Sequence, residues 1–192
     1  MSDPIPNAQE LLEDRIKFKF YAVENHLKLL RELQAKGVTP NNLEGRVKWE
    51  IEIENIISHL IGARDALLVS INKKHGSPLD IGNINPTTMC DKFGFTDLKE
   101  LCDLLELDPK IYPNGSWLKI LNNIRNTGMH RNVINLRHEV ELKEDLNTGR
   151  SSSSPMMIYF KDDPDSKLEV IQYLEDRFQK MKRLIENILS SN

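Results

Sequence analysis

A short segment around residue 125 combines a guanidinium, an amide and an imidazole. Arg125 is followed directly by Asn126, and His130 comes five residues after Arg125. The fork of donors on arginine suits phosphate, and histidine can give or take a proton near neutral pH. On an unbroken helix five residues turn the chain by roughly 500°, which would point the two side chains apart. A break at Thr127-Gly128 would let them converge, and together they are a minimal set for cleaving a phosphodiester without a metal.

Other motifs for catalysis or metal binding are missing from the sequence. It contains no GxxxxGK[ST], GxGxxG or HExxH pattern. Cys90 and Cys102 are not a CxxC pair, and no histidine cluster completes a zinc site around them. The acidic group Asp162, Asp163 and Asp165 is typical of a solvated turn before a helix. We therefore expect no metal and no cofactor.

The segment resembles the signature of the HEPN superfamily (higher eukaryotes and prokaryotes nucleotide-binding domains). Members are α-helical bundles with an arginine, often followed by asparagine, and a histidine a few residues later. Arg125, Asn126 and His130 match the Arg-Asn-x-x-x-His form of this signature. A looser match, 131–138, runs into a predicted strand and is ranked lower.

The resemblance implies a metal-independent endoribonuclease. RNA is the expected substrate because its 2′-hydroxyl can attack the neighbouring phosphate. Arg125 would stabilise charge on the phosphorane-like transition state, and His130 would serve as general base or acid. Asn126 would orient His130 or hold a phosphate oxygen. Many members of the family are toxins or phage-defence components, so an antitoxin protein is a further expected partner. The alternative is a non-catalytic helical module of the same family that binds RNA, a nucleotide or a protein.

Two further residues are candidates beside this motif. Asp65 lies in an otherwise apolar helix, where a charge should be paired. Its carboxylate could hydrogen-bond to Arg125 or His130 without touching the substrate and so orient that side chain. It could instead pair with neighbours of Arg64, or face water. Arg131 could contact RNA. The reaction needs both an acid and a base, so the resemblance and the chemistry both favour a homodimer that brings two motifs together.

Apolar spacing predicts an all-α fold, an antiparallel bundle of about five helices in a single domain, 1–192. Residues 133–162 break the helical pattern with a period of two, which predicts a small β-hairpin with a mobile tip before the last helix. The apolar stripes that predict the helices occur within 16–30, 49–71, 98–105, 117–124 and 171–188.

Local signals predict where these helices begin and end. Asn7 with Glu10 could cap the first helix, and Gly37 is placed to end it. Thr39-Pro40 predicts the start of the second helix, and His75 to Pro78 its end. The fourth helix is predicted from Trp117 to about Thr127, and a capping box of Ser166 and Glu169 is expected to start the last.

Composition and charge narrow the class of protein. The 192 residues are 39% hydrophobic and 29% charged, which is typical of a globular protein. No apolar run approaches the roughly 18 residues of a membrane span, and the N-terminus has no secretion signal, so we expect a cytoplasmic protein that does not enter a membrane.

The charge is unevenly distributed along the chain. The net charge is −3, yet 117–143 carries +3, so the remainder carries −6. This basic stretch could steer RNA, although a solvated face beside a turn would have the same charge pattern.

A weaker alternative function is that of a dimeric structural protein whose last helix forms the dimer interface.

Overall fold

The computed structural model describes residues 10, 14–74, 79–85, 88–89, 117–130, 134, 136–139, 142–145, 150–153, 157–160 and 168–190. Several predictions from the sequence lie outside these residues. They are the predicted helix at 96–107, both cysteines, and the acidic group at 162–165.

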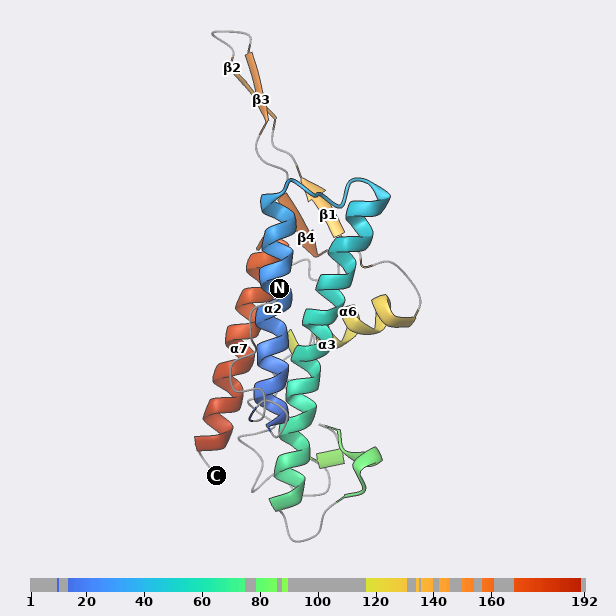
Figure 1. Ribbon diagram of the computed structural model, residues 1–192, viewed down its shortest axis with the longest axis vertical. Coiled ribbons are helices and arrows are strands. Elements are labelled where there is room, and N and C mark those ends of the chain that lie inside the picture. The colour runs from blue at the N-terminus through green and yellow to red at the C-terminus, as the bar shows by residue number, and fades with distance from the viewer. Residues whose placement is uncertain are drawn as a thin grey trace, which may run out of the picture.

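Helices dominate the described part of the chain. They are α2 (Arg15–Ala35), α3 (Leu43–Lys74), α6 (Trp117–His130) and α7 (Val170–Ser190), with a 3₁₀ turn, η1 (Ile81–Asn83). Figure 1 shows α2, α3 and α7 running alongside one another, and α3 contacts α2, α6 and α7. The predicted helical class is confirmed.

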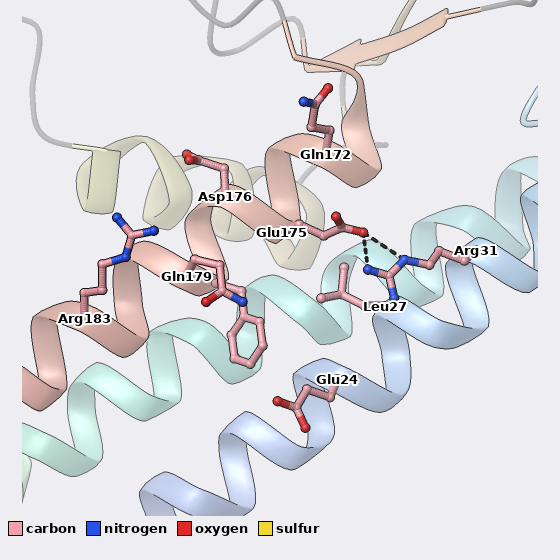
Figure 2. Close-up of a pocket in the computed structure, with 9 residues that line it drawn as sticks. Glu24, Leu27, Arg31, Gln172, Glu175, Asp176, Gln179 and Arg183 are labelled. Atoms are coloured by element: carbon pink, nitrogen blue, oxygen red, sulfur yellow. Dashed lines mark hydrogen bonds and ion pairs between the residues drawn. The ribbon is translucent and has the colours of Figure 1, made fainter.

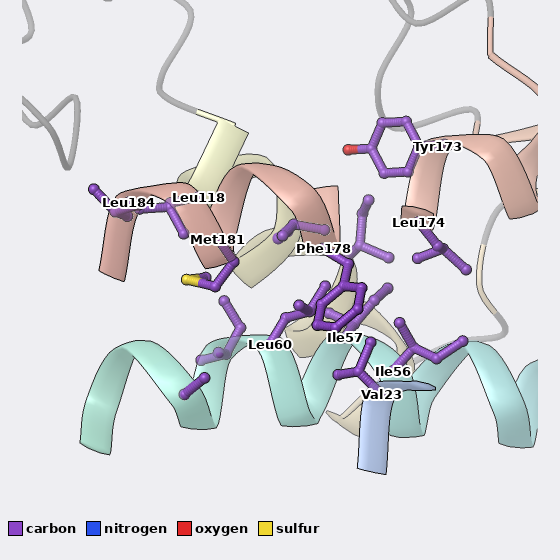
Figure 3. Packing of buried hydrophobic residues seen from close by; sticks show 14 of the residues in the cluster. Val23, Ile56, Ile57, Leu60, Leu118, Tyr173, Leu174, Phe178, Met181 and Leu184 are labelled. Carbon is purple, nitrogen blue, oxygen red and sulfur yellow. The ribbon is translucent and has the colours of Figure 1, made fainter. Parts of the chain in front are cut away.

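Helix α3 is the centre of the core because it is apolar on several sides. Every residue of its predicted stripe, from Trp49 to Ile71, is buried, as are Ile57, Ile61 and Leu68. A helix with so wide an apolar surface must be covered by more than one neighbour. Figure 3 shows Ile56, Ile57 and Leu60 of α3 facing side chains from the other helices, namely Val23, Leu118, Leu174, Phe178 and Met181.

The stripes of the outer helices are also confirmed. Along α7 all six predicted positions between Ile171 and Ile188 are buried. Along α2 the last three positions, Val23, Leu27 and Leu30, are buried, and Ile16 and Phe20 pack partly buried against the core.

Helix α2 ends where predicted but begins later than expected. Asp14, not Asn7, is the N-cap, and its carboxylate accepts hydrogen bonds from the backbone N–H of Ile16 and Lys17, both at 3.0 Å. At the other end Gly37 has φ of 68°, and Val38 N–H donates to Leu33 O at 3.0 Å. This left-handed C-terminal turn is the one that glycine adopts most readily.

Two other predicted helix starts are wrong. Helix α3 begins at Leu43 rather than at Thr39-Pro40, because the side chain of Asn42 accepts from Gly45 N–H at 2.8 Å. Helix α7 begins at Val170, and Glu169 accepts from Ile171 N–H at 2.8 Å, so Glu169 is the cap itself rather than the third helical residue.

Four short strands lie within 133–162. β1 (Leu136–Glu139) pairs antiparallel with β4 (Met157–Phe160), in the register Leu136↔Phe160. β2 (Leu142–Asp145) pairs antiparallel with β3 (Arg150–Ser153), and both project beyond the helices in Figure 1. Residues 146–149 are outside the described part, so the single hairpin with a mobile tip stays a prediction.

Among the helices described, none combines the length and the apolar character needed to cross a membrane.

Candidate functional site

Helix α6 carries the Arg-Asn-x-x-x-His motif, and its apolar residues hold it against α3. Leu118, Leu121 and Ile124 are buried in the core. The helix begins at Trp117 as predicted, although Trp117 itself is only partly buried. The three-residue spacing of the buried positions leaves Arg125 beside the buried face and Asn126 exposed.

The predicted break at Thr127-Gly128 is wrong, because α6 continues to His130. A glycine inside a helix costs only about 1 kcal/mol relative to alanine, so one glycine need not end it. On this continuous helix the Cα atoms of Arg125 and His130 lie roughly 140° apart around the axis, whereas those of Asn126 and His130 lie about 40° apart. The side chains of 127–130 are outside the described part of the structure.

Arg125 has an unusual environment for an arginine. Its side chain is partly buried, and its Nε has no hydrogen-bond partner among the described residues. A buried donor without a partner is unfavourable, and in a native structure it calls for an explanation. A ligand that accepts a hydrogen bond, such as a phosphate oxygen, would satisfy it.

The contacts described for Asp65 are with Arg64 and Lys19. Its carboxylate accepts from its sequence neighbour Arg64, at 3.0 Å from Nε and 2.7 Å from a terminal nitrogen. Burial and Arg15 lower the pKa of the Lys19 amine on α2, and the charge of Asp65 partly opposes this lowering. None of the contacts described for Asp65 reaches Arg125, and Arg131 is outside the described residues.

A second polar cluster, between α2 and α3, is not foreseen by the sequence analysis. His26 Nδ1 lies 2.7 Å from a carboxylate oxygen of Glu52, and the ring of His26 stacks on that of His59 at 5.8 Å between centroids. Lys19 Nζ lies 3.4 Å from His59 Nδ1. The sequence feature that could have revealed this cluster is a shared spacing of seven residues. Lys19 and His26 lie on one face of α2, and Glu52 and His59 lie on one face of α3.

Burial and neighbouring cations lower the pKa values of two members of this cluster, His59 and Lys19. The pKa of His59 falls to about 4, mainly because of burial and then because of Lys19, His26 and Arg15. Burial, followed by Arg15, also lowers the pKa of Lys19. His59 is therefore neutral at pH 7, and its Nδ1 can accept a hydrogen bond from the Lys19 ammonium.

A pocket of about 470 Å³ lies between α2 and α7, and its charges are largely compensated. Figure 2 shows Arg31 of α2 reaching across to Glu175 of α7, where Nε donates at 2.8 Å. Glu24 pairs with Lys182 at 2.8 Å, and Asp176 pairs with basic neighbours on its own helix. This pocket offers no cluster of free charges to a ligand.

A second pocket, of about 730 Å³, lies where α2 begins and α3 ends. Arg15, Lys19 and Lys73 line it. Arg125 lines neither pocket, and nor does any other α6 residue whose side chain the structure describes.

No protein-family model, curated protein or solved structure matches this chain. The HEPN resemblance therefore depends on the residues of the motif.

Proposed function

We propose that the protein is a metal-independent endoribonuclease of the HEPN type, with Arg125, Asn126 and His130 as its catalytic residues. The observation that carries the proposal is the partly buried guanidinium of Arg125, whose Nε has no partner among the described residues. Arg125 would offer its terminal nitrogens to a phosphate, since no described ion pair occupies them, and the exposed Asn126 lies next to it on the same helix.

The roles follow from the chemistry of RNA cleavage. The 2′-hydroxyl attacks the adjacent phosphorus while a base takes its proton, and an acid protonates the leaving 5′-oxygen. His130 would supply the proton transfer, and Arg125 the charge that stabilises the pentacovalent transition state. Asn126 would orient His130, and the position of their Cα atoms on the same side of α6 supports this role.

The continuous helix favours a site built from two copies of the chain. Arg125 and His130 of one α6 lie on different sides of the helix axis. In a two-fold dimer, Arg125 of one protomer can face His130 of the other, and the symmetry then gives two equivalent sites. The proposal thus includes a homodimer, an RNA substrate in the basic region 117–143, and a role as a toxin or in phage defence with an antitoxin as partner. We also propose that the fold is a bundle of about five helices with a β-hairpin inserted before the last helix.

Cleavage of RNA in EDTA tests the activity. Wild-type protein should leave 2′,3′-cyclic phosphate ends, and Arg125→Ala or His130→Ala should slow cleavage about 100-fold or more. Lys48→Ala, at an exposed lysine of α3 that pairs with Glu44, is the control and should change the rate far less. Absence of cleavage by wild-type protein that still binds RNA would reject the enzyme in favour of a non-catalytic RNA-binding module.

Mixing inactive variants tests the shared site. A heterodimer of Arg125→Ala and His130→Ala protomers contains one complete site and one that lacks both groups. Random exchange should restore about a quarter of the wild-type rate if each site takes its arginine and histidine from different protomers. If each chain contains its own complete site, the mixture stays inactive.

A further inference from the structure

The 730 Å³ pocket between the start of α2 and the end of α3 gathers three cations that have no carboxylate partner among the described residues. They are Arg15, Lys19 and Lys73. The guanidinium of Arg15 lies over the ring of Phe18, 4.7 Å from its centroid, and Lys19 contacts the neutral His59. Neither contact neutralises a positive charge, and Asp65 only partly offsets that of Lys19.

The two acidic residues that line the same pocket are engaged elsewhere. Glu10 pairs with Lys17, which does not line the pocket. Asp14 caps α2 through the backbone N–H groups of Ile16 and Lys17. Neither carboxylate forms an ion pair with the three cations, so an anion entering from solvent would meet cations that are not held in ion pairs.

The lowered pKa of Lys19 is also consistent with a pocket that would favour an anion. Burial and Arg15 both lower the pKa of its amine, and Asp65 only partly opposes them. His59, which accepts from Lys19, also has a lowered pKa, partly because Lys19 and Arg15 repel its proton. A bound anion would relieve both effects, because opposite charge favours the protonated forms.

The floor of the pocket is shaped to hold Lys19 in place. A Cβ atom on Gly62 would lie 2.9 Å from Lys19 Cε and 3.2 Å from Nζ, so the lysine lies close against α3 at this glycine and would have to shift if a larger residue stood there. Ala66 and the hydroxyl of Ser70 follow along the same helix. The volume is within the roughly 300–1,000 Å³ of small-molecule sites, so it fits a nucleotide-sized ligand better than a single ion.

We propose that this α2–α3 pocket binds a phosphorylated ligand of nucleotide size, whose phosphate contacts Arg15, Lys19 and Lys73. The ligand is a free nucleotide or the phosphorylated end of an RNA strand, since both present the same dianionic group. The site is separate from the motif on α6 and does not depend on the proposed nuclease activity.

Titration calorimetry of the full-length protein at low salt tests the proposal with inorganic phosphate, AMP and a 5′-phosphorylated hexaribonucleotide. The hexanucleotide is tested in His130→Ala protein, so that cleavage cannot interfere. Binding of AMP or of the hexanucleotide should weaken about 10-fold or more in Lys19→Gln and in Arg15→Gln. Lys48→Gln, which removes an exposed lysine paired with Glu44, is the control and should bind like wild type.

The probes also distinguish the two sources of phosphate and a diffuse charge effect. Preference for AMP identifies a free nucleotide, and preference for the hexanucleotide identifies an RNA end. Ala66→Leu fills the pocket without changing charge and should weaken AMP binding more than inorganic phosphate binding. Equal weakening by Lys48→Gln and Lys19→Gln, or no binding of any probe at millimolar concentration, would overturn the proposal whether or not the protein cleaves RNA.

Discussion

The imidazole rings of His26 and His59 stack across the α2–α3 interface, with their planes 19° from parallel and their centroids 5.8 Å apart. Only His26 has a carboxylate partner in the described part of the chain, Glu52. His59 instead faces Lys19, and Phe18 packs edge-on against its ring. Two like side chains in contact are thus placed in opposite electrostatic surroundings.

This arrangement predicts that stability falls in mild acid. The pKa of His59 is about 4 in the folded protein and near 6.5 when exposed, so the unfolded chain binds more protons between these values. Stability therefore rises with pH in this window and is lost as pH falls from about 6.5 to 4. Because His59 is partly exposed, we expect a loss on the order of 1 to 2 kcal/mol rather than the full value of the pKa shift.

Urea unfolding at several pH values measures this effect. His59→Gln should flatten the dependence between pH 4 and 6.5, because glutamine has no proton to gain. An unchanged slope in His59→Gln would assign the acid sensitivity to other groups.

Arg125 should contribute to function but little to stability. Arg125→Met keeps the length of the side chain and removes a buried Nε that has no described partner, so we expect the free energy of unfolding to change by less than about 1 kcal/mol. Arg46 is the matched control, since it pairs with Glu50 and donates to Ile134 O. Arg46→Met should destabilise by about 1 to 3 kcal/mol. Thermal melts of the two variants give the comparison, and a larger loss for Arg125→Met would show that Arg125 is structural.

Gly45 is required by close packing rather than by its backbone angles. A Cβ atom there would lie 2.0 Å from the carbonyl oxygen of Thr39. Gly45→Ala should therefore destabilise by about 2 kcal/mol or more, although alanine is the better helix former. Gly82→Ala is the control, because nothing lies within 4 Å of its added Cβ. Similar melting temperatures for the two variants would contradict the packing argument.

Asn72 should be the most costly polar side chain to remove from α3. It is buried, donates to Leu79 O at 3.0 Å and accepts from Leu79 N–H at 2.8 Å, which ties the chain after α3 back to the helix. Asn72→Ala leaves both backbone groups without these partners and should destabilise by about 2 to 3 kcal/mol. Urea unfolding beside the exposed Asn83→Ala tests this, and equal stability of the two would refute it.

The helix faces could be read from the sequence because the signal is local. Every predicted position of the α3 and α7 stripes is buried, since a period near 3.6 places apolar residues on one side wherever the helix packs. The starts were predicted less well. Asp14 and Asn42 cap where Asn7 and Thr39 were expected, because several side chains near a helix start can accept its N–H groups.

The candidate site, like the helices, could be predicted from the sequence only in part. The types and order of Arg125, Asn126 and His130 are visible in the sequence, and so is the chemistry they suggest. The continuity of α6 through Gly128 was not, because the weak preference of one glycine is overridden by the packing of the whole helix. Asp65 was a candidate neighbour by its position in an apolar helix, and the ion pair that the structure describes for it is with Arg64.

By itself the amino-acid sequence determined that this chain is helical, which side of each long helix is apolar, and where an Arg-Asn-x-x-x-His pattern occurs. Only the tertiary structure decided which polar groups meet across helices. Lys19 reaches His59, and His26 reaches Glu52, because α2 and α3 pack in one particular register. That register depends on how the side chains of the two helices interlock, which no local pattern in the sequence encodes.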